Sequence, residues 1–312
     1  MLAEQNRLYD MVIIGGGPGG YTAALYAVRA GMKALVVEKL SAGGQMALTH
    51  MIDNYPGFPE GVDGFELGYR MQQGAERFGA ETLYAEVRAV DLKANPKRIS
   101  TSAGEILART VVIATGANPK PLGLPGEKEL TGQGVHYCAA CDGMFYRGKT
   151  VAVVGGGNSA AADALLLSRV AEKVILIHRR DSLRAEKAVA TALEQAQNVE
   201  FRWNSVAEEI IADGRVRGLR LKNVKDGEIS EIDVHGIFVS IGRKSASELF
   251  REQVALDDAG YILAGESTQT SLPGVYAVGD VRTKAVRQIV TAVADGAVAV
   301  HMAEHWLAEQ QA

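Results

Sequence analysis

Two short glycine-rich turns constrain this 312-residue chain more than any other feature. The first, at residues 15–20, follows the apolar run 10–14 and precedes a segment rich in alanine and leucine at 21–30; a second apolar run follows at 33–38. In this strand–turn–helix–strand context a Gly-x-Gly-x-x-Gly turn is the fingerprint of a dinucleotide site. The glycines let the backbone approach a pyrophosphate at the N-terminus of the helix.

The same order of elements recurs in the middle of the chain. An apolar strand at 150–154 leads into a second glycine turn at 155–160, a helix to residue 169 and a strand at 173–177. The chain therefore contains an internal repeat of a binding unit. An α/β fold with two dinucleotide-binding, Rossmann-like domains is predicted.

Two segments are typical of linkers between these domains. Residues 119–126 are rich in proline and glycine, and residues 243–248 are polar. A final helix, expected at about 286–307, is too apolar for a free surface and is expected to pack back on the first domain. The predicted domains are 1–117 with 246–312, which form one discontinuous domain, and 118–245, which is inserted into it.

Charge and hydropathy exclude several classes of partner. The chain has 33 lysines and arginines against 37 acidic residues, a net charge of -4, so no attraction to nucleic acid is expected. The most apolar stretch, 286–302, is interrupted by charged and polar residues, which excludes a membrane span. The first ten residues lack the apolar segment of a secretory signal, so the cytoplasm is the expected location.

The residues that end the two second strands differ in charge. The first strand ends in Glu38, whose carboxylate can accept hydrogen bonds from ribose hydroxyls and would repel a 2'-phosphate. The second ends in His178, Arg179 and Arg180, followed by Arg184, and guanidinium groups suit a phosphate. This difference predicts NADPH rather than NADH at the second turn and a dinucleotide with a bare ribose, such as FAD, at the first. The alternative for the arginines is a solvated basic helix start.

The two cysteines of the chain stand together as Cys138 and Cys141. Residues three apart on a helical turn are neighbours, within the Cα separation of about 4.4 to 6.8 Å that a disulfide requires. A reversible disulfide is therefore predicted; two structural thiols or half of a zinc site are the alternatives. Zinc is disfavoured because His136 is the one nearby imidazole and no second cysteine pair exists. Asp142 can exchange a proton with the thiols, or cap a local turn.

One metal-like motif needs a separate explanation. His301, Glu304 and His305 match the H-x-x-E-H pattern of some zinc proteases. Only seven residues follow, which leaves no room for the further ligand that such a site requires. The segment is interpreted as the polar face of a C-terminal helix, and no metal is expected.

In its order of motifs the chain resembles the low-molecular-weight thioredoxin reductases, over essentially its full length. The matching segments are 15–24, 43–45, 54–57, 114–117, 138–142, 155–160, 178–180, 279–280 and 287–288. The resemblance implies a homodimer, FAD bound by the discontinuous domain, and a redox disulfide within the inserted NADPH domain. The chain departs from the family pattern at Ala140, at Ala162 with Asp163, and in the turn 243–246.

The resemblance also implies which residues bind each cofactor. Gly15, Gly17 and Gly20 would line the FAD pyrophosphate, and the remaining FAD contacts would be Glu38, Gln45, Asn54, Asp280, Arg287 and Gln288. The NADPH site would comprise Gly155, Gly157, Asn158, Ser159, His178, Arg179, Arg180 and Arg184.

The expected reaction passes two electrons from NADPH through the flavin and the Cys138–Cys141 disulfide to thioredoxin. By resemblance Cys141 faces the flavin, Cys138 attacks the partner, and Met144 with Phe145 corresponds to a docking pair, for which core packing is the alternative. Two other functions keep the same fold: a reductase of another disulfide partner such as a peroxiredoxin, and a redox sensor that does not turn over. A ferredoxin–NADP reductase is disfavoured because it has no use for the cysteines, and an oxygen-dependent oxidase because it would not need NADPH.

Overall fold

A computed structural model describes residues 7–49 and 51–310, which form two compact units. The first unit, called unit 1 below, comprises the chain up to Asn118 together with the chain from Lys244 onward. The second, unit 2, is Pro119–Arg243. Each unit contains its own parallel sheet, which confirms the predicted α/β fold with two Rossmann-like units.

Unit 1 is built on a sheet of order β3-β2-β1-β6-β5-β4, with β17 also paired to β6. Strands β1, β2, β3, β6 and β17 are parallel, whereas β4, β5 and β6 are joined antiparallel. The strands are β1 (Leu8–Ile14), β2 (Ala34–Glu38), β3 (Glu81–Tyr84), β4 (Val87–Asp91), β5 (Lys97–Thr101), β6 (Gly104–Ile113) and β17 (Val275–Ala277).

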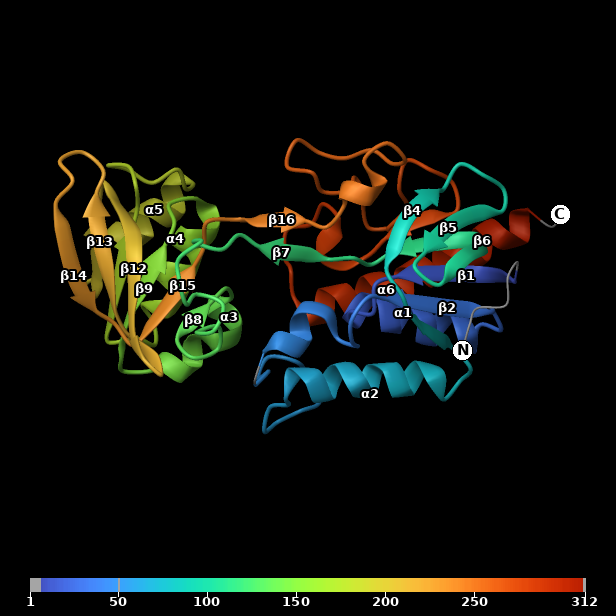
Figure 1. The fold of residues 1–312 in the computed structure, drawn as a ribbon, viewed down its shortest axis with the longest axis horizontal. Helices are drawn as coiled ribbons and strands as arrows, with labels where there is room; N and C mark the ends of the chain where they lie inside the picture. Colours follow the sequence, from blue (N-terminus) through green and yellow to red (C-terminus); the bar gives the residue numbers. More distant parts are fainter. Residues whose placement is uncertain (1–6, 50, 311–312) are drawn as a thin grey trace. The chain divides into compact units, whose positions relative to one another are not determined.

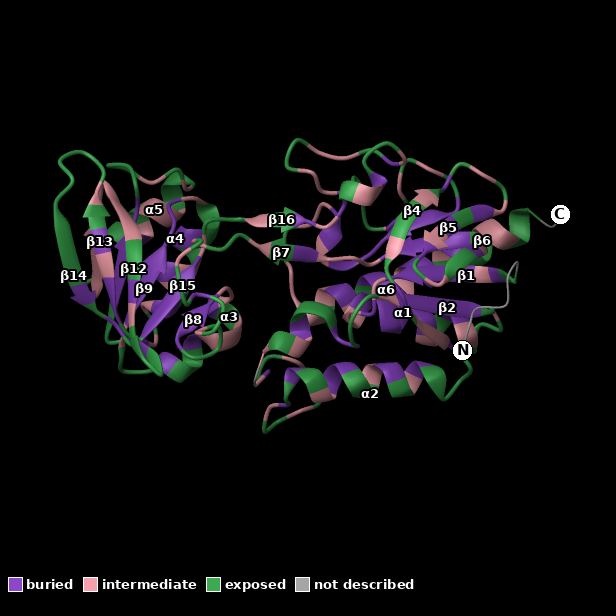
Figure 2. Cartoon of the chain, viewed as in Figure 1, coloured by how far each residue is buried: buried purple, intermediate pink, exposed green. Residues whose placement is uncertain are grey.

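Alternate residues of β1 face two different cores, as a strand buried on both sides requires. Met11 and Ile13 pack with the helices α1 (Pro18–Arg29) and α6 (Ile289–Glu309), and Val12 and Ile14 pack on the opposite face. The purple strands in Figure 2 show this burial. A third helix, α2 (Gly64–Glu76), lies beside α1.

Unit 2 repeats this plan with a different covering layer (Figure 1). Its parallel sheet has the order β11-β10-β9-β15-β8. The helices α4 (Asn158–Leu167) and α5 (Lys187–Glu194) belong to the core on one face, and an antiparallel sheet β12-β13-β14 belongs to the core on the other. The strands are β8 (Val135–His136), β9 (Thr150–Val154), β10 (Lys173–Ile177), β11 (Val199–Arg202), β12 (Ser205–Asp213), β13 (Arg215–Asn223), β14 (Ile229–Asp233) and β15 (Gly236–Val239).

The chain forms a short strand at each expected linker, ending at residue 119, where the first begins, and covering residues 243–245 of the second. Strand β7 (Ala117–Pro119) pairs with β16 (Arg243–Ser245) in a two-stranded sheet where the chain passes between the units. The remaining short elements are α3 (Ala139–Asp142), η1 (Gly44–Leu48), η2 (Gly143–Tyr146), η3 (Glu248–Phe250) and η4 (Gly279–Val281).

The last helix begins later than expected from the sequence, at Ile289 rather than near residue 286. The reason is local, because Gln288 and Thr291 form a reciprocal capping box that satisfies backbone N–H groups of the first turn. None of the helices in the described part of the chain is long and apolar enough to cross a membrane.

Candidate active site and nucleotide sites

The first glycine turn is closed on one side and open on the other. Gly15 has φ 109°, and a Cβ on it would lie 2.5 Å from the carbonyl oxygen of Ala114. A Cβ on Gly20 would lie 2.0 Å from the oxygen of Gly15, so the start of α1 packs directly on the turn. By contrast, no atom lies within 4 Å of a Cβ on Gly17. The turn therefore offers an open backbone surface at the N-terminus of α1, where an anion is stabilised.

The Glu38 carboxylate at the end of β2 is held beside this turn. The Gly16 amide donates to its Oε2 at 2.7 Å, and the Leu40 amide donates to its Oε1 at 3.0 Å. Each carboxylate oxygen keeps a lone pair for a further donor. A neighbouring ribose can therefore hydrogen-bond to Glu38, and a 2'-phosphate would be repelled.

Segments distant in the sequence complete the surroundings of the first turn. The Gly43 amide donates to Gly16 O at 2.8 Å, so η1 starts against the turn. In η1 the Gln45 side chain donates through Nε2 to Asn118 Oδ1 at 2.9 Å. On the other side, a Cβ on Gly19 would lie 3.2 Å from the Val278 side chain, just before η4 and its Asp280.

The other expected FAD residues lie around the start of α6. Asn54 Nδ2 donates to Gln288 Oε1 at 3.1 Å, which brings these two residues together. The Arg287 guanidinium lies 4.1 Å from the centre of the Tyr261 ring. Its Nε is buried and has no hydrogen-bond partner among the described residues.

A buried charged cluster around Asp295 lies behind η4, and the sequence analysis did not predict it. Asp295 Oδ1 accepts from Arg282 at 2.7 Å, and Oδ2 accepts from Lys284 at 2.7 Å and from the Gly279 amide at 2.8 Å. Burial raises the pKa of Asp295, but the hydrogen bonds from Arg282 and Lys284 outweigh it and hold that pKa below its usual value. The carboxylate thus fixes the loop that carries Asp280.

The second glycine turn, in unit 2, has the same backbone geometry. A Cβ on Gly155 would lie 2.4 Å from the oxygen of Ser240, and no atom lies within 4 Å of a Cβ on Gly157. The loop after β10 folds over this turn, because the Arg184 amide donates to Gly156 O at 2.7 Å. The Glu186 amide donates to Asn158 Oδ1 at 2.7 Å, and Ser159 is exposed on the first turn of α4.

His178 lies under this turn and the arginines lie outside it. A Cβ on Gly156 would lie 2.1 Å from the His178 ring, which is buried and whose Nε2 has no partner among the described residues. Burial, followed by the charges of the nearby arginines, lowers the pKa of His178, so the ring is neutral at pH 7. Arg179, Arg180 and Arg184 are exposed and form no ion pair within the described chain.

The cysteines form the predicted disulfide. Cys138 is the N-cap of the single helical turn α3, and Cys141 lies within it at a Cα separation of 5.3 Å. The amides of Cys141 and Asp142 donate to Cys138 O at 3.3 and 3.1 Å. Both cysteines are partly exposed, and Ala139 anchors the turn in the core beneath α4.

The Asp142 carboxylate makes a partly buried contact with His136 that was not predicted. Its Oδ2 lies 3.0 Å from His136 Nδ1, and His136 Nε2 lies 2.6 Å from the Tyr146 hydroxyl. The alternative role of Asp142, capping a local turn, is wrong, because its side chain makes no capping hydrogen bond to α3 or η2. The sequence signal was available in His136, which was weighed only as a zinc ligand.

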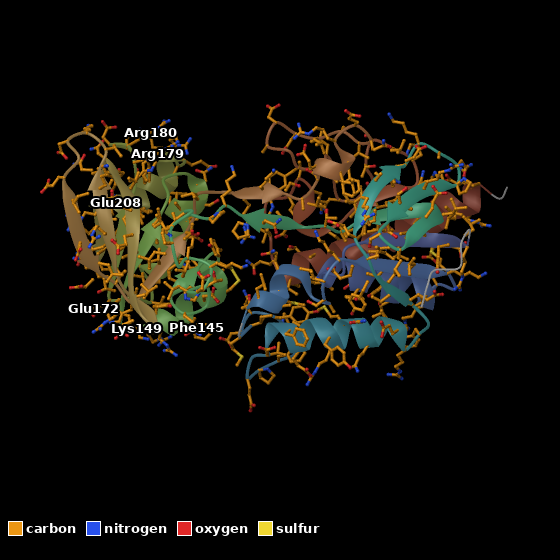
Figure 3. The ribbon with its side chains drawn as sticks, viewed as in Figure 1. Phe145, Lys149, Glu172, Arg179, Arg180 and Glu208 are labelled. Atoms are coloured by element: carbon orange, nitrogen blue, oxygen red, sulfur yellow. A yellow bond between two sulfur atoms is a disulfide. The ribbon has the colours of Figure 1, made fainter. Side chains whose placement is uncertain are left out.

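Two adjacent apolar side chains are exposed on unit 2. Met144 and Phe145 are exposed beside the disulfide turn, which contradicts core packing as their role. Figure 3 shows Phe145 at the opposite end of unit 2 from Arg179 and Arg180.

On α6 the rings of His301 and His305 contact each other, with 4.6 Å between their centres. Within residues 7–49 and 51–310 no cluster of three side chains that could bind a metal exists.

Comparisons with known proteins agree with this geometry. The family model for pyridine nucleotide-disulphide oxidoreductases matches residues 9–296. The thioredoxin reductase of Peptoclostridium acidaminophilum is 44% identical over 307 residues, covering 96% of this chain and 98% of that protein. That of Bacillus subtilis (strain 168) is 42% identical over 309 residues, covering 99% and 98%.

A solved structure gives the same answer. The crystal structure of thioredoxin reductase from Streptococcus pyogenes MGAS5005 is similar with a TM-score of 0.91 and 40% identity, covering 98% of this chain and 100% of that one. The match of both sequence and fold over full length confirms the resemblance inferred from the motifs. The chain belongs to the thioredoxin reductases, within the pyridine nucleotide-disulphide oxidoreductase family.

Proposed function

We propose that this thioredoxin reductase binds FAD in unit 1 and NADPH in unit 2, and reduces the disulfide of thioredoxin through Cys138 and Cys141. One observation carries the proposal: unit 2 holds both the disulfide turn and a glycine turn flanked by three exposed arginines. The proposed site for a phosphorylated nucleotide and the cysteine pair would thus share one unit.

The residues of unit 1 fit FAD. The open face at Gly17 leaves space for a pyrophosphate, and Glu38 accepts hydrogen bonds where the adenosine ribose would follow. The unpartnered Nε of Arg287 is a buried donor that a flavin carbonyl would satisfy, and a buried donor without a partner is costly. Asp280, Gln45, Asn54 and Gln288 are proposed as the remaining contacts.

The residues of unit 2 fit NADPH. The open face at Gly157 corresponds to that at Gly17, and Arg179, Arg180 and Arg184 supply positive charge where a 2'-phosphate would lie. A neutral His178 leaves its buried Nε2 free for a ligand hydrogen bond. Electrostatic complementarity in this unit therefore favours the phosphorylated nicotinamide cofactor over NADH.

The chain's own part in the reaction is thiol–disulfide exchange. Bound FAD would supply the two-electron link between the nicotinamide and the disulfide. Once reduced, Cys138 attacks the partner disulfide as the thiolate, and Cys141 then attacks Cys138 to release the reduced partner. Asp142, next to Cys141 in the same turn, accepts or donates the proton as thiol and thiolate interconvert.

The proposed partner surface is the exposed pair Met144 and Phe145 beside the disulfide turn. Exposed apolar side chains next to a reactive group are typical of protein docking sites. We also propose a homodimer in the cytoplasm. Light scattering of the purified protein tests the dimer and should give about twice the 33.2 kDa of one chain.

A coupled assay tests the function. Purified protein should carry FAD that is released on denaturation, and should oxidise NADPH faster than NADH when thioredoxin is present. A peroxiredoxin reduced directly at a higher kcat/KM would replace thioredoxin as the partner. Oxidation of one equivalent of NADPH without turnover would indicate a redox sensor instead.

A further inference from the structure

A hydrogen-bonded chain of three side chains lies directly behind the disulfide turn: His136 and Tyr146 are buried, and Asp142 is partly exposed. His136, at the end of β8, contacts the Asp142 carboxylate through Nδ1 at 3.0 Å and the Tyr146 hydroxyl through Nε2 at 2.6 Å. His136 is 6% exposed and the Asp142 side chain 16%. The Phe238 ring stacks on the imidazole, with 5.2 Å between the two ring centres, and this fixes the plane of the imidazole. The three groups therefore form one hydrogen-bonded series that ends at the carboxyl beside Cys141.

The direction of these hydrogen bonds follows from the tyrosine. Burial, followed by the negative charge of Asp142, raises the pKa of Tyr146 to about 12, so the phenol keeps its proton at neutral pH. The hydroxyl can then donate to Nε2, which leaves the proton of a neutral imidazole on Nδ1, facing Asp142. If the ring gains a second proton, Nε2 donates to the tyrosine oxygen instead. Both states of His136 are thus fully hydrogen-bonded.

Few other charges act on this series. Asp142 faces His136 from α3 and Tyr146 faces it from η2, whereas Phe238 from β15 is apolar. Arg215, on β13, lowers the pKa of Tyr146 against the effects of burial and of Asp142. The carboxylate that contacts the imidazole is therefore the one beside Cys141.

We propose that His136 is a positioning residue that shares a proton with Asp142, so that the pair, rather than the carboxylate alone, exchanges protons with Cys138 and Cys141. The inference rests on the proposed function of the disulfide. It assigns to the family reaction a residue that the disulfide motif itself does not contain. Tyr146 supports the pair by accepting or donating at Nε2.

The exchange with a partner disulfide balances through this pair. The Cys138 thiol gives its proton to the pair, its sulfur bonds to one partner sulfur, and the partner S–S bond breaks. The first partner thiolate takes up that proton. The Cys141 thiol then gives its proton to the pair and its sulfur displaces the second partner thiolate, which is protonated in turn. Two protons move from this chain to the partner, and the Cys138–Cys141 bond re-forms.

Alkylation of the reduced protein tests the pair without nicotinamide or thioredoxin. The purified holoenzyme is reduced with excess dithiothreitol, desalted and treated with iodoacetamide between about pH 5.5 and 9.5, the range in which histidines and thiols titrate. Mass spectrometry gives the rate at each cysteine. The parental profile should contain two steps, because the pair and the thiol titrate together.

His136→Asn separates hydrogen bonding from proton storage. Asparagine can donate to Asp142 but binds no proton at these pH values, so the variant should show one step, at higher pH. Alkylation of the variant at pH 7 should be about tenfold slower than that of the parent, which corresponds to a thiol pKa about one unit higher. The matched control is Tyr137→Phe, which removes a partly buried hydroxyl that donates to Glu127 Oε1 at 2.7 Å. It adjoins Cys138 but lies outside the series, so its profile should keep both steps.

A second pair of variants decides the case if His136→Asn does not fold. Asp142→Asn should also lose the lower step, and adding His136→Gln to it should cause no further change, since paired residues act as a unit. A single-step parental profile, or a His136→Asn profile that superimposes on the parental one, overturns the inference while leaving the proposed function intact. Cysteines that stay unreactive after dithiothreitol would instead contradict the proposed function, and the inference with it.

Discussion

The first glycine of each glycine turn packs against a backbone oxygen beside the neighbouring strand in both units. In unit 1 a Cβ on Gly15 would lie 2.5 Å from the oxygen of Ala114, and in unit 2 a Cβ on Gly155 would lie 2.4 Å from the oxygen of Ser240. Each oxygen belongs to the residue that follows the neighbouring parallel strand, β6 or β15. The first glycine of each turn is therefore required by sheet packing, whatever ligand the turn binds.

The difference between the units lies one residue further on. The second glycine lies against a residue at the end of the next strand. This is Glu38, the last residue of β2, in unit 1, and His178, the residue after β10, in unit 2. A Cβ on Gly16 would lie 3.1 Å from Glu38 Oε2, and one on Gly156 would lie 2.1 Å from His178. Glycine at this position thus allows the side chain at the strand end to lie close to the turn, and the identity of that side chain determines the charge beside the turn. Under the proposed function, one fold element would serve two nucleotides through a change at a single position and in the loop that follows it.

The largest effect should come from the feature that unit 2 alone has, its disulfide. Cys138→Ser and Cys141→Ser should each lower turnover with thioredoxin by about a thousandfold or more, equivalent to about 4 kcal/mol. Ferricyanide reduction by NADPH should continue, because it needs no dithiol. Either variant keeping near-parental thioredoxin turnover would show that the electrons take another route.

The next comparison sets a buried aspartate of unit 1 against an exposed one of unit 2. Asp295→Asn should lower the free energy of unfolding by about 3 to 5 kcal/mol, because Arg282 and Lys284 would stay buried without their counter-charge. Asp213→Asn, in an exposed pair with Arg217, should change it by less than about 0.5 kcal/mol. Urea unfolding at pH 7 measures both, and similar values would contradict the assigned role of the buried cluster.

The same aspartate predicts a pH dependence with a definite sign. The folded-state pKa of Asp295 is lowered, so its contribution is complete above the unfolded value of about 3.9 and is lost as the pH falls through the folded value. The difference in unfolding free energy between parent and Asp295→Asn should therefore shrink in acid. Repeating the urea titration at pH 5 and near pH 3 checks this, and a constant difference would be inconsistent with it.

These cases show what the sequence could and could not supply. The glycine turns, their charges and the cysteine pair were predictable because each lies within one short segment. The links from Asp295 to Arg282, and from His136 to Asp142, depend on a helix or strand end folding over a loop. Spacing alone did not reveal them. The antiparallel sheet β12-β13-β14 was also missed, because its strands carry many charged residues and give no clear apolar run.

The charge difference between the two turns can be tested by removing two of the arginines beside the second turn. Replacing Arg179 and Arg180 together with glutamine should raise the KM for NADPH at least about tenfold, since each charge-assisted bond contributes about 1.5 to 3 kcal/mol. The KM for NADH should change little, because NADH lacks the 2'-phosphate. Arg217→Gln on the exposed surface of unit 2 and Glu38→Gln in unit 1 are the controls, neither of which should alter this preference. Equal losses for both nucleotides would contradict the assignment.

The smallest effect concerns the third position of each turn, where the units differ by one methyl group. Gly20 in unit 1 corresponds to Ala160 in unit 2, which is buried at the start of α4. A Cβ on Gly20 would lie 2.0 Å from backbone, so Gly20→Ala must displace α1 and should cost about 1 to 3 kcal/mol. Ala160→Gly should cost only about 0.5 to 1 kcal/mol, from backbone entropy. Thermal unfolding with hydrogen exchange would place each loss in its own unit. A larger loss of stability for Ala160→Gly than for Gly20→Ala would mean that α1 can accommodate a Cβ at residue 20, contrary to the close approach of the Gly15 oxygen.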